Sequence, residues 1–179
     1  IQDALAVTPV IERAACSNDC NPAAKSVHNY AAMVQNSSKH CFLGFDGKKN
    51  AEKIIEIAKI AIGGEENFKA RPPVTGNVCP TSPLTLVDET CESIIACAKG
   101  GIGILIIPMS LSGASSPATL AGVIVQHNAE VLSALILAQL TRKGTPCVYG
   151  GCSTIMDLKL GGSPVGVPEN ALLNVAWAK

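Results

Sequence analysis

Apolar and polar residues along this chain follow two periods, one helical and one typical of strands. Residues 50–62 place isoleucine and alanine on one face and lysine and glutamate on the other, and a pair of glycines follows them. This pattern predicts an amphipathic helix ended by glycine. Three further segments of helical period predict helices that end near Lys99, end near Leu140, and run from Pro168 to the last residue.

Two of these helices have a recognisable start. Thr85 and Asp88 stand in the spacing of a capping box, with a shorter carboxylate than the usual Glu, before the helix that ends near Lys99. Ser116 suits an N-cap and Pro117 suits the first helical position of the long helix that follows. We therefore expect these helices to begin at those residues.

Short apolar runs separate the helical segments and predict about four β-strands. The runs are 41–45, 74–79, 102–109 and 146–150. The run 102–109 is continuously apolar, as in a strand covered on both faces of a parallel sheet. Strict alternation of helices and strands predicts an α/β fold of βα units with right-handed crossovers. A doubly wound sheet and a TIM barrel both fit this pattern.

Known phosphate-binding signatures are missing from this alternation. The glycine-rich stretch 100–103 precedes a predicted strand, whereas the dinucleotide fingerprint joins a strand to the helix after it. The sequence also contains no Walker phosphate loop. The sequence therefore gives no reason, from these two motifs, to expect a nucleotide ligand, because neither is present.

Composition narrows the class of protein. The 179 residues weigh 18.4 kDa, 47% of them are hydrophobic, and 14 Lys and Arg balance 14 Asp and Glu. This balance is untypical of disordered chains and of proteins that hold nucleic acid through its phosphates. No run reaches the roughly 18 uninterrupted apolar residues of a membrane helix. We expect a globular protein with neither a nucleic-acid partner nor a membrane partner.

The two ends of the chain suggest a piece of a longer protein. The chain starts at Ile1 without an initiator methionine, and its last helical segment reaches Lys179 without a glycine or asparagine stop. We therefore expect further residues on one or both sides.

Eight cysteines raise the question of disulfides. Cys97 and Cys147 lie inside a predicted helix and a predicted strand, where a free cysteine behaves as a small buried hydrophobe. We expect reduced thiols and a cytoplasmic protein. The spacing from Cys16 to Cys20, and from Cys147 to Cys152, does not match a zinc ribbon, so we expect no bound metal.

Candidate chemistry gathers in three loops that follow predicted strands. They span 77–84, 109–117 and 149–157, and they are rich in Ser, Thr and Gly but poor in charge. In parallel βα folds such loops carry the functional groups, here hydroxyls and backbone N–H groups. Taken alone, each loop is better explained by ordinary turn and cap residues.

A few side chains in and near these loops stand out. Asp157 is either a ligand for a cationic substrate or a cap on the next turn. Glu130 lies in a helix among apolar residues, where burial would demand partners, and it serves packing as readily as function. Tyr149 ends a strand and either faces a cation or joins the core. The stretch 112–116 could bind an anion at a helix start.

Eight short strings within and between these loops carry a family resemblance. They are CPTSPL at 79–84, MSLSGASSP at 109–117, LAG at 120–122, HNAEVL at 127–132, AQL at 138–140, YG at 149–150, DLK at 157–159 and PVGVPE at 164–169. In this order and spacing the chain resembles the trimethylamine methyltransferase family. The resemblance is strongest over residues 40–179.

The resemblance implies a fold and an activity. Members of the family fold as a (β/α)8 barrel, of which residues 1–179 would be a central part of about four βα units. Such enzymes move a methyl group from trimethylamine, or a related methylated amine, to the Co(I) corrinoid of a separate corrinoid protein. The implied cofactor is therefore a corrinoid on a partner, and half a barrel with open sheet edges further implies a homo-oligomer.

The resemblance also implies where the amine binds. Because cobalt is the nucleophile, the enzyme has to hold the methyl carbon in line and exclude water. The residues implied to bind the substrate are Thr81, Met109, Ser110, Ser112, Glu130, Tyr149, Gly150, Ser153 and Asp157. The pyrrolysine that activates trimethylamine in this family has its place beyond Lys179, so no catalytic residue is assigned in this chain.

Three alternatives stay open at this point. One is the quaternary-amine branch of the glycine betaine type, which lacks pyrrolysine, although the strings CPTSPL and DLK favour the trimethylamine branch. Another is a non-catalytic relative that holds an amine without transferring a methyl group. The last is an unrelated barrel enzyme that binds phosphate at the serine-rich loop 112–116.

Overall fold

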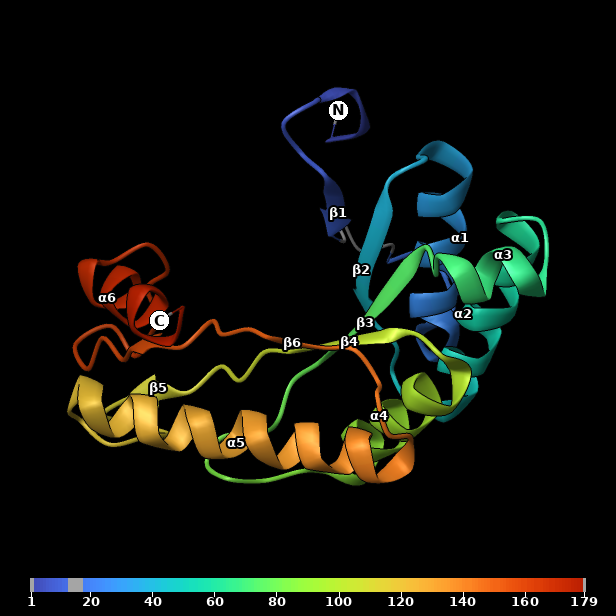
Figure 1. Cartoon of the computed structure of the whole chain (residues 1–179). Helices are drawn as coiled ribbons and strands as arrows, with labels where there is room; N and C mark the ends of the chain where they lie inside the picture. The colour runs from blue at the N-terminus through green and yellow to red at the C-terminus, as the bar shows by residue number, and fades with distance from the viewer. Residues whose placement is uncertain (1, 13–17, 179) are drawn as a thin grey trace.

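Five parallel strands form one sheet in the computed structural model, which describes residues 2–12 and 18–178 (Figure 1). Their order across the sheet follows the chain: β1 (Val10–Glu12), β2 (His40–Gly44), β3 (Val74–Val78), β4 (Gly103–Ile106) and β6 (Cys147–Tyr149). The α/β class and the parallel sheet are therefore confirmed. Among the described strands the order never reverses, whereas a doubly wound sheet has a reversal at its switch point.

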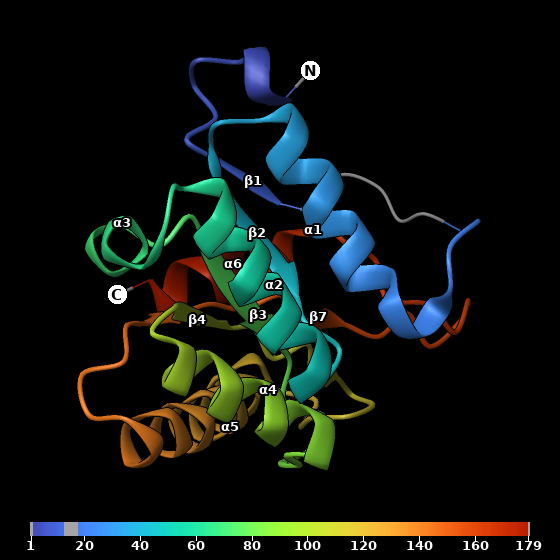
Figure 2. The same cartoon turned by 90° about the vertical axis from the view of Figure 1, so that its right-hand side faces the viewer.

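One layer of helices covers one face of this sheet, and Figure 2 looks onto that layer. Its members are α1 (Lys25–Asn36), α2 (Lys48–Ala61), α4 (Asp88–Gly100) and α5 (Leu120–Thr141). Each helix packs against the next along the chain. Three shorter elements of the described chain do not belong to this series of four helices. They are the helix α3 (Glu65–Ala70) and two 3₁₀ turns, Gln2–Ala4 and Pro22–Ala24.

The core lies between the helix layer and the sheet. On the strands, alternate residues such as Leu43, Ile104 and Ile106 point to the helices and are almost fully buried. Ile54 of α2 and Ile94 of α4 have no exposed surface in the same cluster. Burial of each such side chain stabilises the fold by about 1.5–3 kcal/mol relative to leaving it exposed.

Two strands continue beyond the sheet as a narrow arm, which Figure 1 shows alongside the first half of α5. The arm contains β5 (Leu111–Ser112), β7 (Thr154–Ile155) and α6 (Pro168–Trp177). Four backbone N–H groups, at residues 150, 152, 154 and 156, donate to the carbonyls at 106, 108, 110 and 112. The pairing of β4 with β6 therefore runs on into the pairing of β5 with β7 as one parallel ladder.

Most predicted elements are confirmed within a few residues, but two predicted helix starts are wrong. The long helix begins at Leu120, because Thr119 caps it by accepting the Gly122 N–H at 3.2 Å. Ser116 and Pro117 instead belong to the preceding turn, where Ser116 N–H donates to the Leu111 carbonyl.

The predicted capping box at residue 85 is also wrong. The helix α4 follows Val87 without a side-chain cap. Thr85 lies in the turn before it, where its backbone exchanges two hydrogen bonds with Thr81, at 2.8 and 2.9 Å. Its hydroxyl donates to the Pro83 carbonyl at 2.9 Å and is therefore unable to cap α4.

The long helix α5 has an unusual composition for its position. In the described part of the chain it is the one helix long and apolar enough to cross a membrane, judged by length and composition alone, and one such helix is weak evidence. Its buried face carries His127 and Glu130, while Val125 and Leu140 are 72% and 81% exposed on the opposite face.

The cysteines that the structure describes have free thiols, and Cys16 lies outside the described residues. Cys97 is fully buried in α4, where desolvation raises the pKa of its thiol to about 12. Within the described ranges, no group of three or more His, Cys, Asp or Glu side chains is arranged to hold a metal ion.

Candidate functional site

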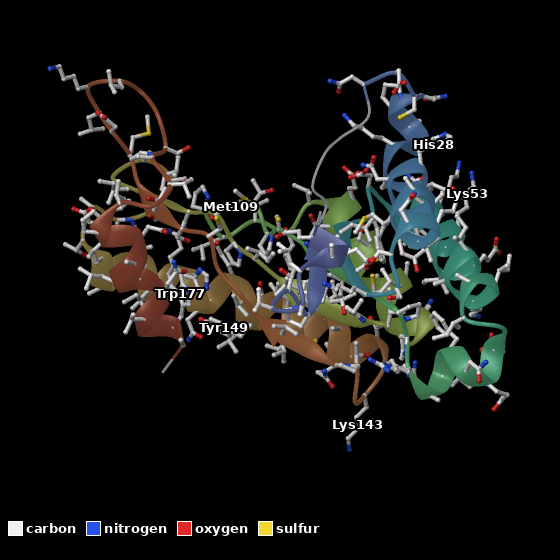
Figure 3. The ribbon with its side chains drawn as sticks, turned by 90° about the horizontal axis from the view of Figure 1, so that it is seen from above. His28, Lys53, Met109, Lys143, Tyr149 and Trp177 are labelled. Carbon is white, nitrogen blue, oxygen red and sulfur yellow. The ribbon has the colours of Figure 1, made fainter. Side chains whose placement is uncertain are left out.

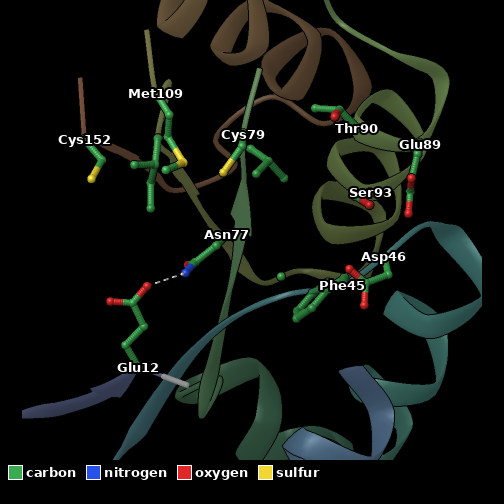
Figure 4. Close-up of a pocket in the computed structure, with 13 residues that line it drawn as sticks. Glu12, Phe45, Asp46, Asn77, Cys79, Glu89, Thr90, Ser93, Met109 and Cys152 are labelled. Atoms are coloured by element: carbon green, nitrogen blue, oxygen red, sulfur yellow. Dashed lines mark hydrogen bonds between the residues drawn. The ribbon is translucent and has the colours of Figure 1, made fainter. Parts of the chain in front are cut away.

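A cavity of about 510 Å³ opens at the carboxyl ends of the parallel strands (Figure 4). This is the edge where βα folds place their functional groups. The ends of β1, β2 and β3, the segments that follow β2, β3 and β4, and the first turns of α4 supply most of its lining. The lining residues are Glu12, Gly44, Phe45, Asp46, Asn77, Val78, Cys79, Glu89, Thr90, Ser93, Ile107, Met109 and Cys152.

The charge of this lining is of one sign. Glu12, Asp46 and Glu89 contribute carboxylates, and among the described lining residues there is no Lys, Arg or His. Carboxylates that share a cavity repel one another, and a bound cation relieves that repulsion. The cavity is therefore suited to a cationic ligand.

A buried amide oxygen without a hydrogen-bond partner among the described residues belongs to another lining residue of this cavity, Asn77. Asn77 is the second-last residue of β3, and its Nδ2 donates to Glu12 Oε1 at 3.4 Å, as Figure 4 shows. Its Oδ1 is buried and accepts no hydrogen bond from any described residue. Because a buried polar atom without a partner is costly, this oxygen is suited to accept a hydrogen bond from a ligand N–H.

The Asp46 carboxylate is held by a fixed turn between β2 and α2. The backbone at Asp46 is left-handed, with φ of +50°. Ser26 Oγ donates to the carbonyl of Phe45 at 3.1 Å, and Asn50 Nδ2 donates to the carbonyl of Asp46 at 3.3 Å. Gly47 N–H donates to Ser93 Oγ at 3.2 Å. These bonds come from three helices and fix the strained turn from both sides.

Three sulfur-bearing side chains complete the wall. Cys79, Met109 and Cys152 follow β3, β4 and β6, and all line the cavity (Figure 4). Desolvation, together with the nearby Cys152 and Glu12, raises the pKa of the Cys79 thiol, so this thiol is neutral at physiological pH. A neutral thiol and a thioether give the wall a soft, weakly polar surface, suited to methyl groups.

Of the residues that the sequence predicted to bind substrate, Met109 lines this cavity. Ser110, Ser112 and Ser153 are buried in the arm, and Ser112 Oγ donates to the carbonyls of residues 117 and 118. Thr81 is exposed in the turn before α4, and Gly150 lies on the ladder. A role for these residues in binding stays a prediction.

The three ionisable or aromatic candidates have structural partners. Glu130 is 1% exposed and accepts from Ser82 Oγ, Leu84 N and Gln126 Nε2 at 2.8–2.9 Å. Asp157 Oδ1 accepts from the backbone N–H groups of residues 159 and 160, as in a turn cap. The hydroxyl of Tyr149 donates to Asn128 Oδ1 at 3.3 Å. None of the three lines the cavity.

Sequence patterns did not identify the carboxylates of the cavity, or the amide of Asn77, as candidate site residues. Asp46 follows a predicted strand directly, and Asn77 opens one of the predicted loops, so both carried the strand-end signal that the loops were chosen for. Glu12 had no such signal, because the three-residue strand β1 has too short a pattern to be predicted.

The chain matches one family over nearly its whole length. Residues 7–179 match the family described as "Trimethylamine methyltransferase (MTTB)". A trimethylamine methyltransferase MttB of Desulfitobacterium hafniense (strain DSM 10664 / DCB-2) is 42% identical over 177 residues, covering 99% of this chain and 36% of the relative.

Two other relatives extend the comparison. A trimethylamine methyltransferase MttB of Methanosarcina thermophila is 43% identical over 157 residues, covering 87% of this chain and 32% of that protein. A glycine betaine methyltransferase of Desulfitobacterium hafniense (strain Y51) is 36% identical over 149 residues, covering 83% of this chain and 31% of that protein. The chain thus spans about a third of the length of the curated relatives it matches.

Proposed function

Because the chain belongs to the trimethylamine methyltransferase family, we propose that it forms the amine-binding part of an enzyme that demethylates trimethylamine or a related methylated amine. The methyl acceptor in this proposal is the Co(I) corrinoid of a cognate corrinoid protein, which acts as a second substrate. The observation that carries the proposal is the cavity lined by three carboxylates and by no cationic side chain among the described residues.

The cavity supplies binding and orientation in this mechanism. Glu12, Asp46 and Glu89 attract an ammonium group, and Asn77 Oδ1 accepts the N–H of a protonated tertiary amine. The thioether of Met109 and the thiols of Cys79 and Cys152 contact the N-methyl groups and keep water away from them. Transfer then needs the methyl carbon in line with the approaching nucleophile.

The same lining favours an amine without a carboxylate over glycine betaine. A zwitterionic substrate brings its own negative charge into a cavity that already holds three carboxylates, and no described lining residue carries a positive charge to pair with it. Like charges that share a cavity repel one another. Trimethylamine is therefore the proposed substrate, and the quaternary-amine alternative is disfavoured.

A (β/α)8 barrel is the proposed fold of the complete enzyme. The described strands follow one another in the sheet without reversal, and the helices α1, α2, α4 and α5 follow in the same order on one face. A closed barrel repeats this arrangement until its first and last strands pair. The cavity, at the carboxyl ends of the strands, then lies at the barrel mouth.

The proposed binding role is tested with trimethylammonium chloride as probe and isothermal titration calorimetry as readout. The substitution Glu12→Gln removes one charge and keeps the shape of the side chain, so we expect about fivefold weaker binding, or about 1 kcal/mol. The matched control Glu66→Gln changes an exposed carboxylate on α3 and should leave binding unchanged.

Two further measurements make this test decisive. Tertiary-butyl alcohol, a neutral molecule of similar shape, should not bind measurably if charge recognition dominates. Asp157→Ala should leave trimethylammonium binding intact, because Asp157 caps a turn outside the cavity. Weaker binding in Asp157→Ala, together with unchanged binding in Glu12→Gln, would move the amine site away from this cavity.

Self-association is a second part of the proposal. In the described chain β6 is an edge strand, with Val148 and Tyr149 exposed, and α5 exposes Val125, Ile136 and Leu140. Such surfaces are typical of interfaces. We expect sedimentation velocity of the 179-residue chain to give a dimer or larger species over the micromolar range. A monomer at all concentrations would contradict this expectation.

A further inference from the structure

A buried imidazole joins the arm to two helices. His127 of α5 has no exposed surface, and its ring stacks on Trp177 of α6 with 4.2 Å between centroids and 8° between planes. The ring of Tyr149 lies 5.4 Å away in a tilted arrangement. Figure 3 shows Tyr149 and Trp177 on the same side of the molecule, next to the arm that bears Met109.

The parallel ladder between residues 106–112 and 150–156 has one face toward the cavity and one buried face. On one face, Met109 and Cys152 line the cavity. The next residues along each strand, Ser110 and Ser153, are fully buried on the other face. Ser110 N–H donates to Ser153 Oγ at 3.2 Å, and the two hydroxyl oxygens lie 2.9 Å apart. Any movement of this serine pair therefore moves both cavity residues.

The chain of hydrogen bonds continues to His127, whose Nδ1 lies 3.4 Å from Ser153 Oγ. The neutral tautomer with its hydrogen on Nε2 pairs both hydroxyl hydrogens, because Ser110 then donates to Ser153 and Ser153 donates to Nδ1. In this arrangement the unpaired donor of the cluster is His127 Nε2–H, since Nε2 has no partner among the described residues.

Protonation of His127 would break this pairing. Nδ1 would become a donor to Ser153 Oγ, so Ser153 could donate only to Ser110. The hydroxyl hydrogen of Ser110 would then have no acceptor in the described part of the chain. A charged ring would therefore leave the Ser110 hydroxyl unpaired where the neutral ring allows it a partner, and an unpaired buried donor costs about 1–3 kcal/mol.

The groups around the imidazole offer limited compensation for a charge. Glu130 lies one turn further along α5, but its carboxylate already accepts three hydrogen bonds. Tyr149 faces the ring from β6, Cys152 precedes Ser153 in the arm, and α6 presents the uncharged Trp177. Desolvation lowers the pKa of His127, against a smaller rise from the Gly150 backbone and from Glu130.

From this geometry we infer that His127 is a positioning residue, which in its neutral form holds the Met109 and Cys152 wall of the cavity in place through Ser153 and Ser110. Acidification releases the wall, because the charged imidazole cannot keep the serine pair in the same arrangement. The effect of His127 on the position of the wall does not depend on which reaction the enzyme catalyses. Its effect on turnover rests on the proposed methyl transfer.

The emission of Trp177 reports the state of the imidazole, because this is the only tryptophan in the chain. A protonated imidazole stacked on an indole quenches its fluorescence. We expect emission to be constant from pH 8 to pH 7 and to fall at lower pH, with a midpoint below about 6.5, the ordinary value for histidine. His127→Gln should remove this transition, and an unchanged transition in His127→Gln would overturn the inference.

The serine pair is tested by two matched substitutions. Ser153→Ala removes the partner of Nδ1 in both protonation states, so the midpoint of the fluorescence transition should shift from that of the wild type. Ser163→Ala removes an exposed hydroxyl beyond β7 and should leave the midpoint unchanged. Equal midpoints in the two variants would contradict a hydrogen-bonded link between Ser153 and His127.

The position of the wall is tested through the reactivity of Cys152 at pH 7.5. N-ethylmaleimide labelling is followed by peptide mass spectrometry, with the similarly half-buried Cys91 of α4 as an internal reference. His127→Ala should raise the ratio of Cys152 to Cys91 labelling at least threefold, whereas His127→Gln should stay within twofold of the wild type. An unchanged ratio in His127→Ala would overturn the positioning role.

Turnover distinguishes this inference from the proposed function. In a methyl-transfer assay of the full-length enzyme with its corrinoid protein, His127→Ala should raise KM for trimethylamine more than it lowers kcat, because the wall contacts the bound amine. A full-length wild-type enzyme that transfers no methyl group to its corrinoid protein, but gives the fluorescence and labelling results expected above, would refute the proposed function and leave the positioning role standing. Normal KM in a variant with a displaced wall would refute the link to substrate binding.

Discussion

Replacing Glu130 by alanine should lower the free energy of unfolding by about 2–3 kcal/mol. The carboxylate holds the turn between β3 and α4 against α5, because it accepts from Ser82 Oγ and Leu84 N while Gln126 fixes its other side. Leu84 has a left-handed backbone with φ of +51°, so its turn depends on external bonds. Urea unfolding followed by far-ultraviolet circular dichroism measures the change.

A conservative variant separates hydrogen bonding from charge at this site. In Glu130→Gln the amide oxygen keeps the Leu84 and Gln126 bonds, and the Ser82 hydroxyl can rotate to accept from the amide nitrogen. We expect a loss below about 1 kcal/mol and unchanged binding of trimethylammonium. Glu130 was also a predicted substrate ligand, so a stable Glu130→Gln protein that fails to bind trimethylammonium would assign it to the amine site.

The second large effect is expected at Gly151. A Cβ atom there would lie 2.5 Å from His127 Cε1 and 2.8 Å from Trp177 Cε2, well inside normal contact distances. Two stacked rings cannot yield as a flexible side chain does, so Gly151→Ala should lower the free energy of unfolding by about 1–3 kcal/mol. It should also separate the rings and change the emission of Trp177.

Gly162 provides the matched control for this substitution. It lies in the loop after β7, and a Cβ there would meet no atom within 4 Å. Gly162→Ala therefore makes the same chemical change without a clash, and its stability should stay within about 0.5 kcal/mol of the wild type. Equal stability of the two variants would show that the ring stack opens easily and is not closely packed.

The regular elements of the fold could be predicted because their signals are local. The helix α2 repeats its apolar residues every three to four positions, and the predicted run 102–109 contains β4 in full. The start of α5 could not be predicted in this way. Ser116 and Thr119 are both good caps by residue type, and the choice of Thr119 depends on the turn that ties Ser116 to Leu111.

The candidate site was less predictable, because it is assembled from distant segments. The loop strings led to Met109, but the carboxylates of Glu12 and Asp46 reach the cavity only through the order of the strands. The partners of Glu130 could not be predicted for the same reason. Its sequence environment predicts a need for partners, yet the partners Ser82 and Leu84 lie more than 45 residues away in the chain.

The long ladder between residues 106–112 and 150–156 constrains how the chain can change in length. Side chains on a strand alternate between two faces, so the loss of residue 151 would exchange the faces of the residues that follow it. Cys152 would turn from the cavity toward α5, and Ser153 would turn into the cavity. The last ladder bond is at Met156, and the following ten residues form an exposed loop. We therefore expect insertions and deletions to be tolerated after Met156 and to be destabilising before it.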